Sequence, residues 1–231
     1  MNFSVIIPTH DRPDFLGEAV ASVLAQSVID FEVLIVNDGN GQISLPLDPR
    51  IRILHNYQRG PVPARNLGVS EARGDYIAFL DDDDVWIDRQ HLAEALRLLQ
   101  AGAKFTFGNG IMQFPGEAQL RHFDLTATAQ SLERDNTILI SAVCYEKALH
   151  HSLGLFDEAL PFYWDWDWYL RVVRDGHHLV HITQSVVDIR IHPQNMSGNS
   201  NEAERRAGLD AFAAKHKLGF ISLKNHADFV R

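Results

Sequence analysis

The clearest candidates for chemistry are four consecutive carboxylates, Asp81 to Asp84, which directly follow the apolar run YIAFL. Adjacent carboxylates repel one another, so either some of them take up protons or a cation lies among them. A hard divalent ion is the simplest solution, because such ions take oxygen ligands. A solvated turn is the alternative interpretation of this run.

The sequence around this run excludes several familiar ligand-binding loops. An EF-hand loop that began at Asp81 would need an oxygen ligand, a Gly and a Glu at three later positions, but Val85, Trp86 and Leu92 stand there. The patterns GxxxxGK and GxGxxG, whose backbones bind phosphates, do not occur. A phosphorylated ligand at this point would therefore need a metal ion and a few basic side chains.

A second candidate is the segment FYWDWDWYLR, in which Asp165 and Asp167 alternate with tryptophans. Alternation is typical of a strand, but the apolar residues that follow it break the pattern. The spacing i, i+3, i+4, i+7 from Trp166 to Val173 instead predicts a helix that ends at Gly176, with Trp166 facing the core. Asp165 then lies at the helix N-terminus, where it is either a cap or an ionised carboxylate available as a base.

Strand and helix signals alternate through the first half of the chain, and these elements must position the acids. Helical patterns separate apolar runs that we interpret as strands at 3–7, 31–36, 51–54 and 76–80. This alternation predicts an α/β fold with a mainly parallel central sheet flanked by helices, whose ligands bind outside the carboxyl ends of the strands. Thr9, Asp38 and the acidic run should meet at that edge.

The second half of the chain is less regular. We expect strands at 104–108, 137–145 and 186–192, a loop with one short helix at 115–135, and a helix with a thin apolar face from about 202 to 216.

Composition narrows the classes of partner. The chain has 21 basic and 30 acidic residues and a formal charge of −9, without a basic patch, so no nucleic-acid partner is expected. Cys144 is the only cysteine, and Met1 leads into a strand-like run rather than a signal peptide, so we expect a cytoplasmic location. No apolar run approaches the roughly 20 residues that span a bilayer, and any membrane association should be peripheral.

Five segments occur in a characteristic order: VIIPTHDRP, VNDG, ARNLGVSEARGDYIAFLDDDD, WDWDWYLR and IRIHPQNMS. Together they resemble the inverting family-two glycosyltransferases with the GT-A fold. The resemblance implies a single Rossmann-like domain over 1–231, with a nucleotide-binding half at 1–102, a smaller acceptor and catalytic half at 103–198, and a C-terminal helical tail at 199–231. It also implies sugar transfer from a nucleotide-diphosphate sugar, with a UDP-sugar favoured, to a carbohydrate or other hydroxyl acceptor in glycan or polysaccharide biosynthesis.

The same resemblance implies roles for donor-binding residues. Pro8, Thr9 and Asp38 would line the nucleoside pocket, with Asp38 reaching the base. Arg65 would lie beside the base or the diphosphate. A surface salt bridge is the alternative for Arg65.

The resemblance assigns the metal site to the acidic run. Asp81 and Asp83 would form the DxD motif of the family, with Asp83 as a ligand of Mn²⁺ or Mg²⁺ and Asp81 or Asp82 near the ribose. His192 matches a histidine that closes over the metal and diphosphate, although it could also be a plain loop residue before Pro193.

Asp165 matches the general base of the family, whereas Asp167 has no catalytic assignment. The family usually carries a Glu directly before the base, and this sequence has Trp164 there. An indole face presented to a sugar acceptor is one interpretation of that substitution.

Several other residues have structural interpretations. We expect Leu155 and Phe156 in the core, and Arg12 either on a phosphate or paired with Asp14. The histidines lack a zinc-ligand spacing, so we expect them on the surface, at 150, 151, 177, 178 and 181.

Two other functions remain as alternatives. A non-catalytic nucleotide-sugar binding module would account for the missing Glu before Asp165. A sugar-phosphate nucleotidyltransferase would need a glycine-rich basic loop after the first strand, but PTHDRP contains neither Gly nor Lys.

Overall fold

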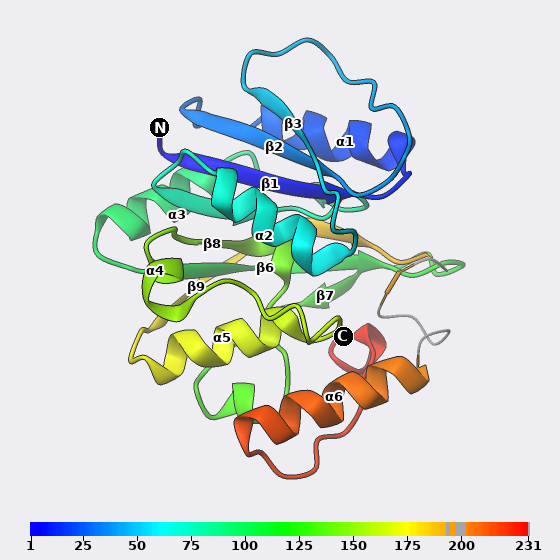
Figure 1. The fold of residues 1–231 in the computed structure, drawn as a ribbon, viewed down its shortest axis with the longest axis vertical. Coiled ribbons are helices and arrows are strands. Elements are labelled where there is room, and N and C mark those ends of the chain that lie inside the picture. Colours follow the sequence, from blue (N-terminus) through cyan, green and yellow to red (C-terminus); the bar gives the residue numbers. More distant parts are fainter. Residues whose placement is uncertain (193–194, 197–201, 231) are drawn as a thin grey trace.

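A computed structural model describes residues 1–192, 195–196 and 202–230. Its centre is a sheet of nine strands in the order β3-β2-β1-β4-β8-β6-β9-β5, with β7 paired to β6 (Figure 1). The strands are β1 (Phe3–Thr9), β2 (Phe31–Asn37), β3 (Ile51–His55), β4 (Tyr76–Phe79), β5 (Val85–Trp86), β6 (Phe105–Gln113), β7 (Arg121–Phe123), β8 (Val143–Glu146) and β9 (Leu179–Arg190).

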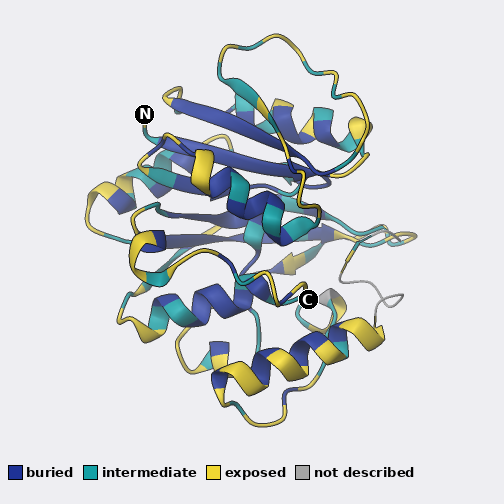
Figure 2. Cartoon of the chain, in the orientation of Figure 1, coloured by how far each residue is buried: buried dark blue, intermediate teal, exposed yellow. Residues whose placement is uncertain are grey.

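The first four strands are parallel, as the alternation of strands and helices predicts. Every residue of β1 and β2 is buried, because helices cover both faces of the sheet (Figure 2). The longer helices are α1 (Pro13–Leu24), α2 (Pro61–Glu71), α3 (His91–Gln100), α4 (Leu149–Leu153), α5 (Trp164–Arg174) and α6 (Glu202–His216).

The helices divide between the two faces of the sheet. The apolar sides of α1 and α3 pack with Val5, Ile7 and Val33 on one face. On the other face, α2, α5 and α6 pack with Ile6 and Leu34 in a second cluster. The core therefore forms two layers with the sheet between them, and α5 and α6 lie in the same layer (Figure 1).

The second half departs from the parallel pattern. β8 pairs antiparallel with β4 and with β6, whereas β6 and β9 are parallel. The expected strand at 137–145 is only partly correct, because residues Ile140–Ala142 form a 3₁₀ turn, η2, before β8 begins. Another such turn, η1, covers Ser131–Glu133, and a third, η4, covers His226–Asp228.

The predicted helix at 202–216 is present, and a stripe of buried side chains runs along its inner side while its outer side is exposed (Figure 2). Phe212 from this stripe is stacked against Trp166 of α5, with ring centroids 4.4 Å apart. Trp166 therefore faces the core as expected.

The structure tests three predictions of burial: those for His150 and Leu155 were wrong, and that for Phe156 is confirmed. His150 is buried rather than on the surface, because its ring lies between the Tyr145 hydroxyl at 2.8 Å and the Gly154 carbonyl at 2.9 Å. Leu155 is 43% exposed, so its assignment to the core was wrong, whereas Phe156 is in the core.

Cys144 lies on β8 and is fully buried, with its Sγ 3.7 Å from His91 Nε2. Burial raises the pKa of this thiol far above its ordinary value.

Candidate active site

The carboxyl ends of β1, β2 and β4 bring the predicted polar residues to one edge of the sheet. Pro8 and Thr9 end β1, Asp38 follows β2, and the acidic run begins two residues after Phe79. All of them line a single cleft of about 490 Å³. Clefts of this size can hold small-molecule ligands, so the sequence-predicted edge has the dimensions of a binding site.

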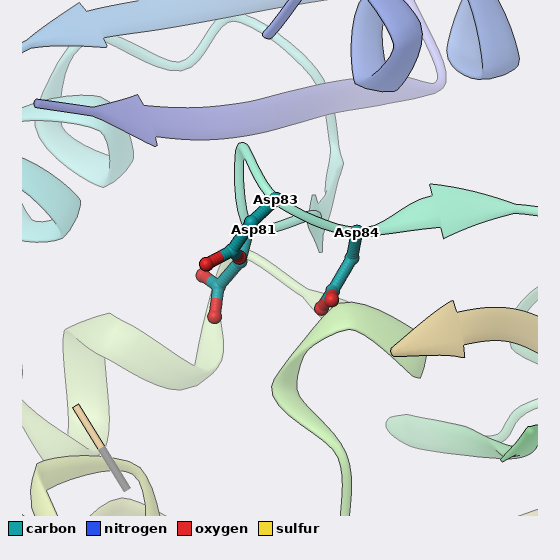
Figure 3. Close-up of side chains that lie close together, drawn as sticks. All are labelled: Asp81, Asp83 and Asp84. Atoms are coloured by element: carbon teal, nitrogen blue, oxygen red, sulfur yellow. The ribbon is translucent and has the colours of Figure 1, made fainter. Parts of the chain in front are cut away.

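Three carboxylates of the acidic run converge (Figure 3). Oxygens of Asp81, Asp83 and Asp84 lie within 4.8 Å of one another. The Ser141 hydroxyl donates to Asp84 at 2.6 Å, and Arg65 pairs with Asp81. Asp84 carried no assignment from the sequence, although its place in the same run was the signal that could have included it.

The environment of these carboxylates opposes their ionisation. Burial raises the pKa of Asp82 to about 6. Burial raises the pKa of Asp81 as well, and the charge of Asp83 adds to the effect. The pKa of Asp84 lies well above its usual range, because of burial and then the charges of Asp83 and Asp81. A divalent cation would relieve this repulsion, so the oxygen-rich donor set fits Mg²⁺ or Mn²⁺.

Arg12 and His192 both contact Asp83. Arg12 Nη1 donates to Asp83 Oδ2 at 2.5 Å and lies 3.3 Å from Asp82, so this arginine is paired with the acidic run rather than with Asp14. His192 Nε2 lies 2.9 Å from the same Asp83 oxygen, and its ring stacks on Phe15. His192 is therefore packed against the acidic run. Pro193, Gln194 and Ser197 of the IRIHPQNMS segment lie outside the described residues.

Asp38 is buried beneath the loop that leads into α2. Its carboxylate accepts hydrogen bonds from Asn56 Nδ2 at 2.6 Å and from the Gly60 N–H at 2.9 Å. Gly60 has φ 108°, a conformation that favours glycine, and this turn aims its N–H at Asp38. On the neighbouring strand, the Thr9 hydroxyl donates to Asp82 at 2.6 Å. Asp38 thus fixes one wall of the cleft.

Arg65 is buried between the acidic run and the start of α5. Its guanidinium contacts Asp81 and lies over the Trp164 ring at 4.5 Å from the centroid, a cation–π contact. The alternative of a surface salt bridge is therefore excluded. Trp164 is 7% exposed, with Arg65 over its ring and Phe156 against it, so its indole face is not free to stack on a sugar.

Asp165 reaches the cleft from the first turn of α5. The residue at the helix N-cap is Tyr163, with φ 61°, so Asp165 is not the cap. Asn136 Nδ2 donates to Asp165 Oδ2 at 2.9 Å. Burial raises the pKa of Asp165 despite this hydrogen bond and the nearby charge of Arg65. A carboxylate with a raised pKa is a stronger base than an exposed one.

Asp167 has a different environment from Asp165. It is completely buried and accepts contacts from His216 Nε2 at 2.8 Å and Lys215 Nζ at 2.5 Å, both on α6. Arg171 of its own helix donates to it at 3.0 Å. The two acids of the WDWDW segment are therefore separated: Asp165 lines the cleft and Asp167 joins α5 to α6.

The C-terminal residues also line the cleft, which the sequence did not predict. Arg205 of α6 is buried and donates to Asn225 and to the Lys224 carbonyl. These three residues and Phe229 form part of the cleft wall. No sequence pattern in this region indicated such a role.

Comparisons with known proteins establish the family. Residues 4–152 match the model of glycosyl transferase family 2. The chain is also 31% identical to the uncharacterized glycosyltransferase YwdF of Bacillus subtilis, over 98% of this chain and 88% of that protein. The chain belongs to glycosyl transferase family 2. As a member of this family it is a glycosyltransferase, and the nucleotidyltransferase alternative is set aside.

Solved structures with the same fold include two nucleotide-sugar complexes. S. aureus TarS 1-349 in complex with UDP-GlcNAc matches with a TM-score of 0.73 at 16% identity, over 93% of this chain and 66% of that one. A Pyrobaculum calidifontis mannosyltransferase in complex with GDP-Man and Mn²⁺ matches with a TM-score of 0.67 at 15% identity, over 95% and 65%. These matches confirm the GT-A fold, and the chain spans about two thirds of each of these two solved chains.

Among the helices of the described residues, none has the length and apolar character that a membrane crossing requires.

Proposed function

We propose that this family-two glycosyltransferase transfers a sugar from a nucleoside-diphosphate sugar to a hydroxyl acceptor with inversion at the anomeric carbon. The observation that carries the proposal is the shared cleft, in which three converging carboxylates at the end of β4 and Asp165 of α5 line one space. The complexes of TarS with UDP-GlcNAc and of the mannosyltransferase with GDP-Man support a nucleotide-sugar donor. We favour a UDP-sugar.

On the donor side, Pro8, Thr9 and Asp38 would hold the nucleoside. Asp81 or Asp82 would contact the ribose, and Arg65 would lie beside the diphosphate, where its buried Nε has no hydrogen-bond partner among the described residues.

The acidic run suits a divalent ion, Mn²⁺ or Mg²⁺. Asp83 and His192 would be its ligands, and Asp81 and Asp84 lie close enough to add oxygens. A bound divalent ion would stabilise the negative charge that develops on the leaving diphosphate. The Mn²⁺ in the mannosyltransferase complex supports this proposal.

Asp165 is the proposed general base. The acceptor oxygen forms a bond to the anomeric carbon as the bond from that carbon to the donor phosphate breaks, and the diphosphate leaves with the electron pair. The hydroxyl proton passes to Asp165. Because attack and departure occur on opposite faces of the sugar, the configuration at the anomeric carbon inverts.

Thermal stabilisation by a panel of nucleoside diphosphates and their sugars, with and without Mn²⁺, tests the donor and metal assignments. A ligand at 100 times its dissociation constant stabilises the folded state by about 2.7 kcal/mol, which is readily measured. We expect the largest shift with a uridine nucleotide and Mn²⁺. If no nucleotide shifts the melting temperature with or without Mn²⁺, the donor assignment is wrong.

Turnover separates the enzyme from a binding module that lacks activity. The nucleotide sugar that stabilises the protein is incubated with it, and release of the nucleoside diphosphate is followed with and without added sugar acceptors. Release that depends on Asp165 supports the proposal, whereas binding without any release supports the non-catalytic module.

A further inference from the structure

We propose that Asn136 is a positioning residue for the base: its side-chain amide holds the Asp165 carboxylate toward the acceptor and favours its ionised form. This inference rests on the proposed role of Asp165. Asn136 comes from the irregular segment between η1 and η2, and both residues line the cleft.

The hydrogen bond between the two side chains has a defined direction. An ionised carboxylate only accepts hydrogen bonds, so the amide nitrogen of Asn136 must face Asp165 Oδ2, at 2.9 Å. The N–H groups of Trp166 and of Asp165 itself also donate to this carboxylate. Among the described side chains, the Asn136 amide is the hydrogen-bond donor that helps to fix the rotation of the carboxylate.

The amide oxygen of Asn136 indicates that this residue does more than hold the fold together. Its Oδ1 is buried and has no hydrogen-bond partner among the described residues. Buried polar atoms are nearly always paired, and leaving one unpaired costs about 1–3 kcal/mol. An asparagine that served only to join two segments would have both ends satisfied, whereas here its one side-chain hydrogen bond in the described chain is to Asp165.

The backbone on both sides of Asn136 is anchored. Trp166 of α5 donates from its indole N–H to the Leu132 carbonyl at 2.6 Å. The Thr137 hydroxyl donates to the Thr126 carbonyl at 3.1 Å. Because the first of these contacts comes from the residue next to Asp165, the segment and the start of α5 are held together, and the amide is delivered in a fixed place.

Other charged and titratable groups face Asp165 from the surrounding elements. Arg65 approaches from α2 and stabilises the carboxylate by its charge. Tyr163 lies two residues before Asp165, and Tyr169 lies in the same helix. Burial raises the pKa of each phenol, and the charge of Asp165 adds to the effect. Arg205 of α6 lies beside Tyr163. Among the described side chains, however, Asn136 supplies the hydrogen bond to Asp165, and its removal should raise the pKa of that carboxyl.

The test compares Asn136→Ala with Gln130→Ala, which removes an exposed amide just before η1. The pKa of the Asp165 carboxyl is measured by ¹³C NMR of aspartate-labelled protein, with Asp165→Asn to assign the signal. We expect the pKa to rise by about one unit in Asn136→Ala and to stay unchanged in Gln130→Ala.

Kinetics give a second measurement with the donor identified by the thermal screen. We expect Asn136→Ala to lower kcat about 10- to 100-fold at neutral pH and to shift the acid limb of the pH profile upward, while donor affinity stays within twofold. Asn136→Ser, which keeps a hydrogen-bond donor, should recover part of the loss. It also takes the place of the alanine variant if that variant does not fold.

An unchanged Asp165 pKa and an unchanged pH profile in Asn136→Ala would overturn the proposal, even if kcat fell. The failure of the underlying base assignment has a different signature, because Asp165→Asn would then retain turnover whatever the Asn136 variants do.

Discussion

At the scale of single residues, one oxygen has two competing uses. Asp83 Oδ2 accepts a hydrogen bond from Arg12 at 2.5 Å and lies 2.9 Å from His192 Nε2. The guanidinium supplies positive charge at the place where the proposed divalent ion would need a ligand. A divalent ion bound through this oxygen would therefore compete with Arg12 for it.

Asp83→Asn tests the metal ligand. Loss of the carboxylate charge should weaken Mn²⁺-dependent nucleotide binding at least tenfold, which corresponds to about 1.4 kcal/mol. Thermal shifts with and without Mn²⁺ measure the effect, and Asp88→Asn, beyond the acidic run, is the control. Wild-type nucleotide binding in Mn²⁺ would remove Asp83 from the ligand set.

His192→Ala has a narrower expected effect. Donor binding with Mn²⁺ should weaken about tenfold, whereas binding without metal should stay the same, because His192 contacts the acidic run. Titration calorimetry under both conditions measures the difference. If affinity and rate match the wild type, His192 is only a loop residue.

The pKa of Asp165 gives the reaction a pH dependence with a definite sign. Only the ionised carboxylate accepts a proton, and burial raises its pKa above the ordinary value of 3.8. The rate should therefore fall as pH drops through this raised pKa. Asp165→Asn should abolish that limb and reduce transfer about 10²- to 10⁴-fold while leaving nucleotide binding nearly intact.

At the scale of elements, α6 is held to α5 by a buried charge cluster. The Asp167 carboxyl is fully buried, which opposes its ionisation. Hydrogen bonds from His216 and Lys215 and the charge of Arg171 outweigh that burial and keep its pKa below 3.8. The carboxylate is therefore charged at neutral pH and joins two helices that both contribute to the cleft.

Asp167→Asn should destabilise the protein by about 2 kcal/mol at neutral pH, because it removes the buried carboxylate that accepts contacts from His216, Lys215 and Arg171. Urea unfolding measures the change. Since the pKa of Asp167 is depressed, its contribution is present above the unfolded pKa and is lost as pH falls through the folded one, so the variant and wild type should converge in acid.

Asp157→Asn is the matched control for that variant. Asp157 contacts the same Lys215 Nζ at 2.7 Å but is partly exposed, so its removal should cost less than about 1 kcal/mol. Equal losses in the two variants would contradict the importance of the buried cluster.

At the scale of the whole molecule, the two halves differ in how far the sequence predicts them. The strands of the first half are continuous buried runs with local turn signals, so β1 to β4 and their shared edge followed from sequence pattern. In the second half, Ser141 donates to Asp84 and accepts from the Asp81 N–H at 3.0 Å. These tertiary hydrogen bonds favour a turn where the apolar run alone predicted a strand.

The sequence predicted which residues lie at the site better than it predicted which of their side chains contact one another. Pro8, Asp38 and the acidic run could be placed because strand ends share an edge. The pairing of Arg12 with Asp83 and of Asn136 with Asp165 joins residues far apart in the sequence, and no periodicity encodes either one. The same holds for the C-terminal residues of the cleft wall.

The burial of Cys144 has a practical consequence for measuring motion. A thiol that is inaccessible and has a raised pKa reacts poorly with alkylating reagents. A cysteine introduced at Glu204, an exposed position on α6, would therefore take a fluorophore at one site without removal of the native residue. Its emission would then report whether α6 closes over the cleft when nucleotide and acceptor bind.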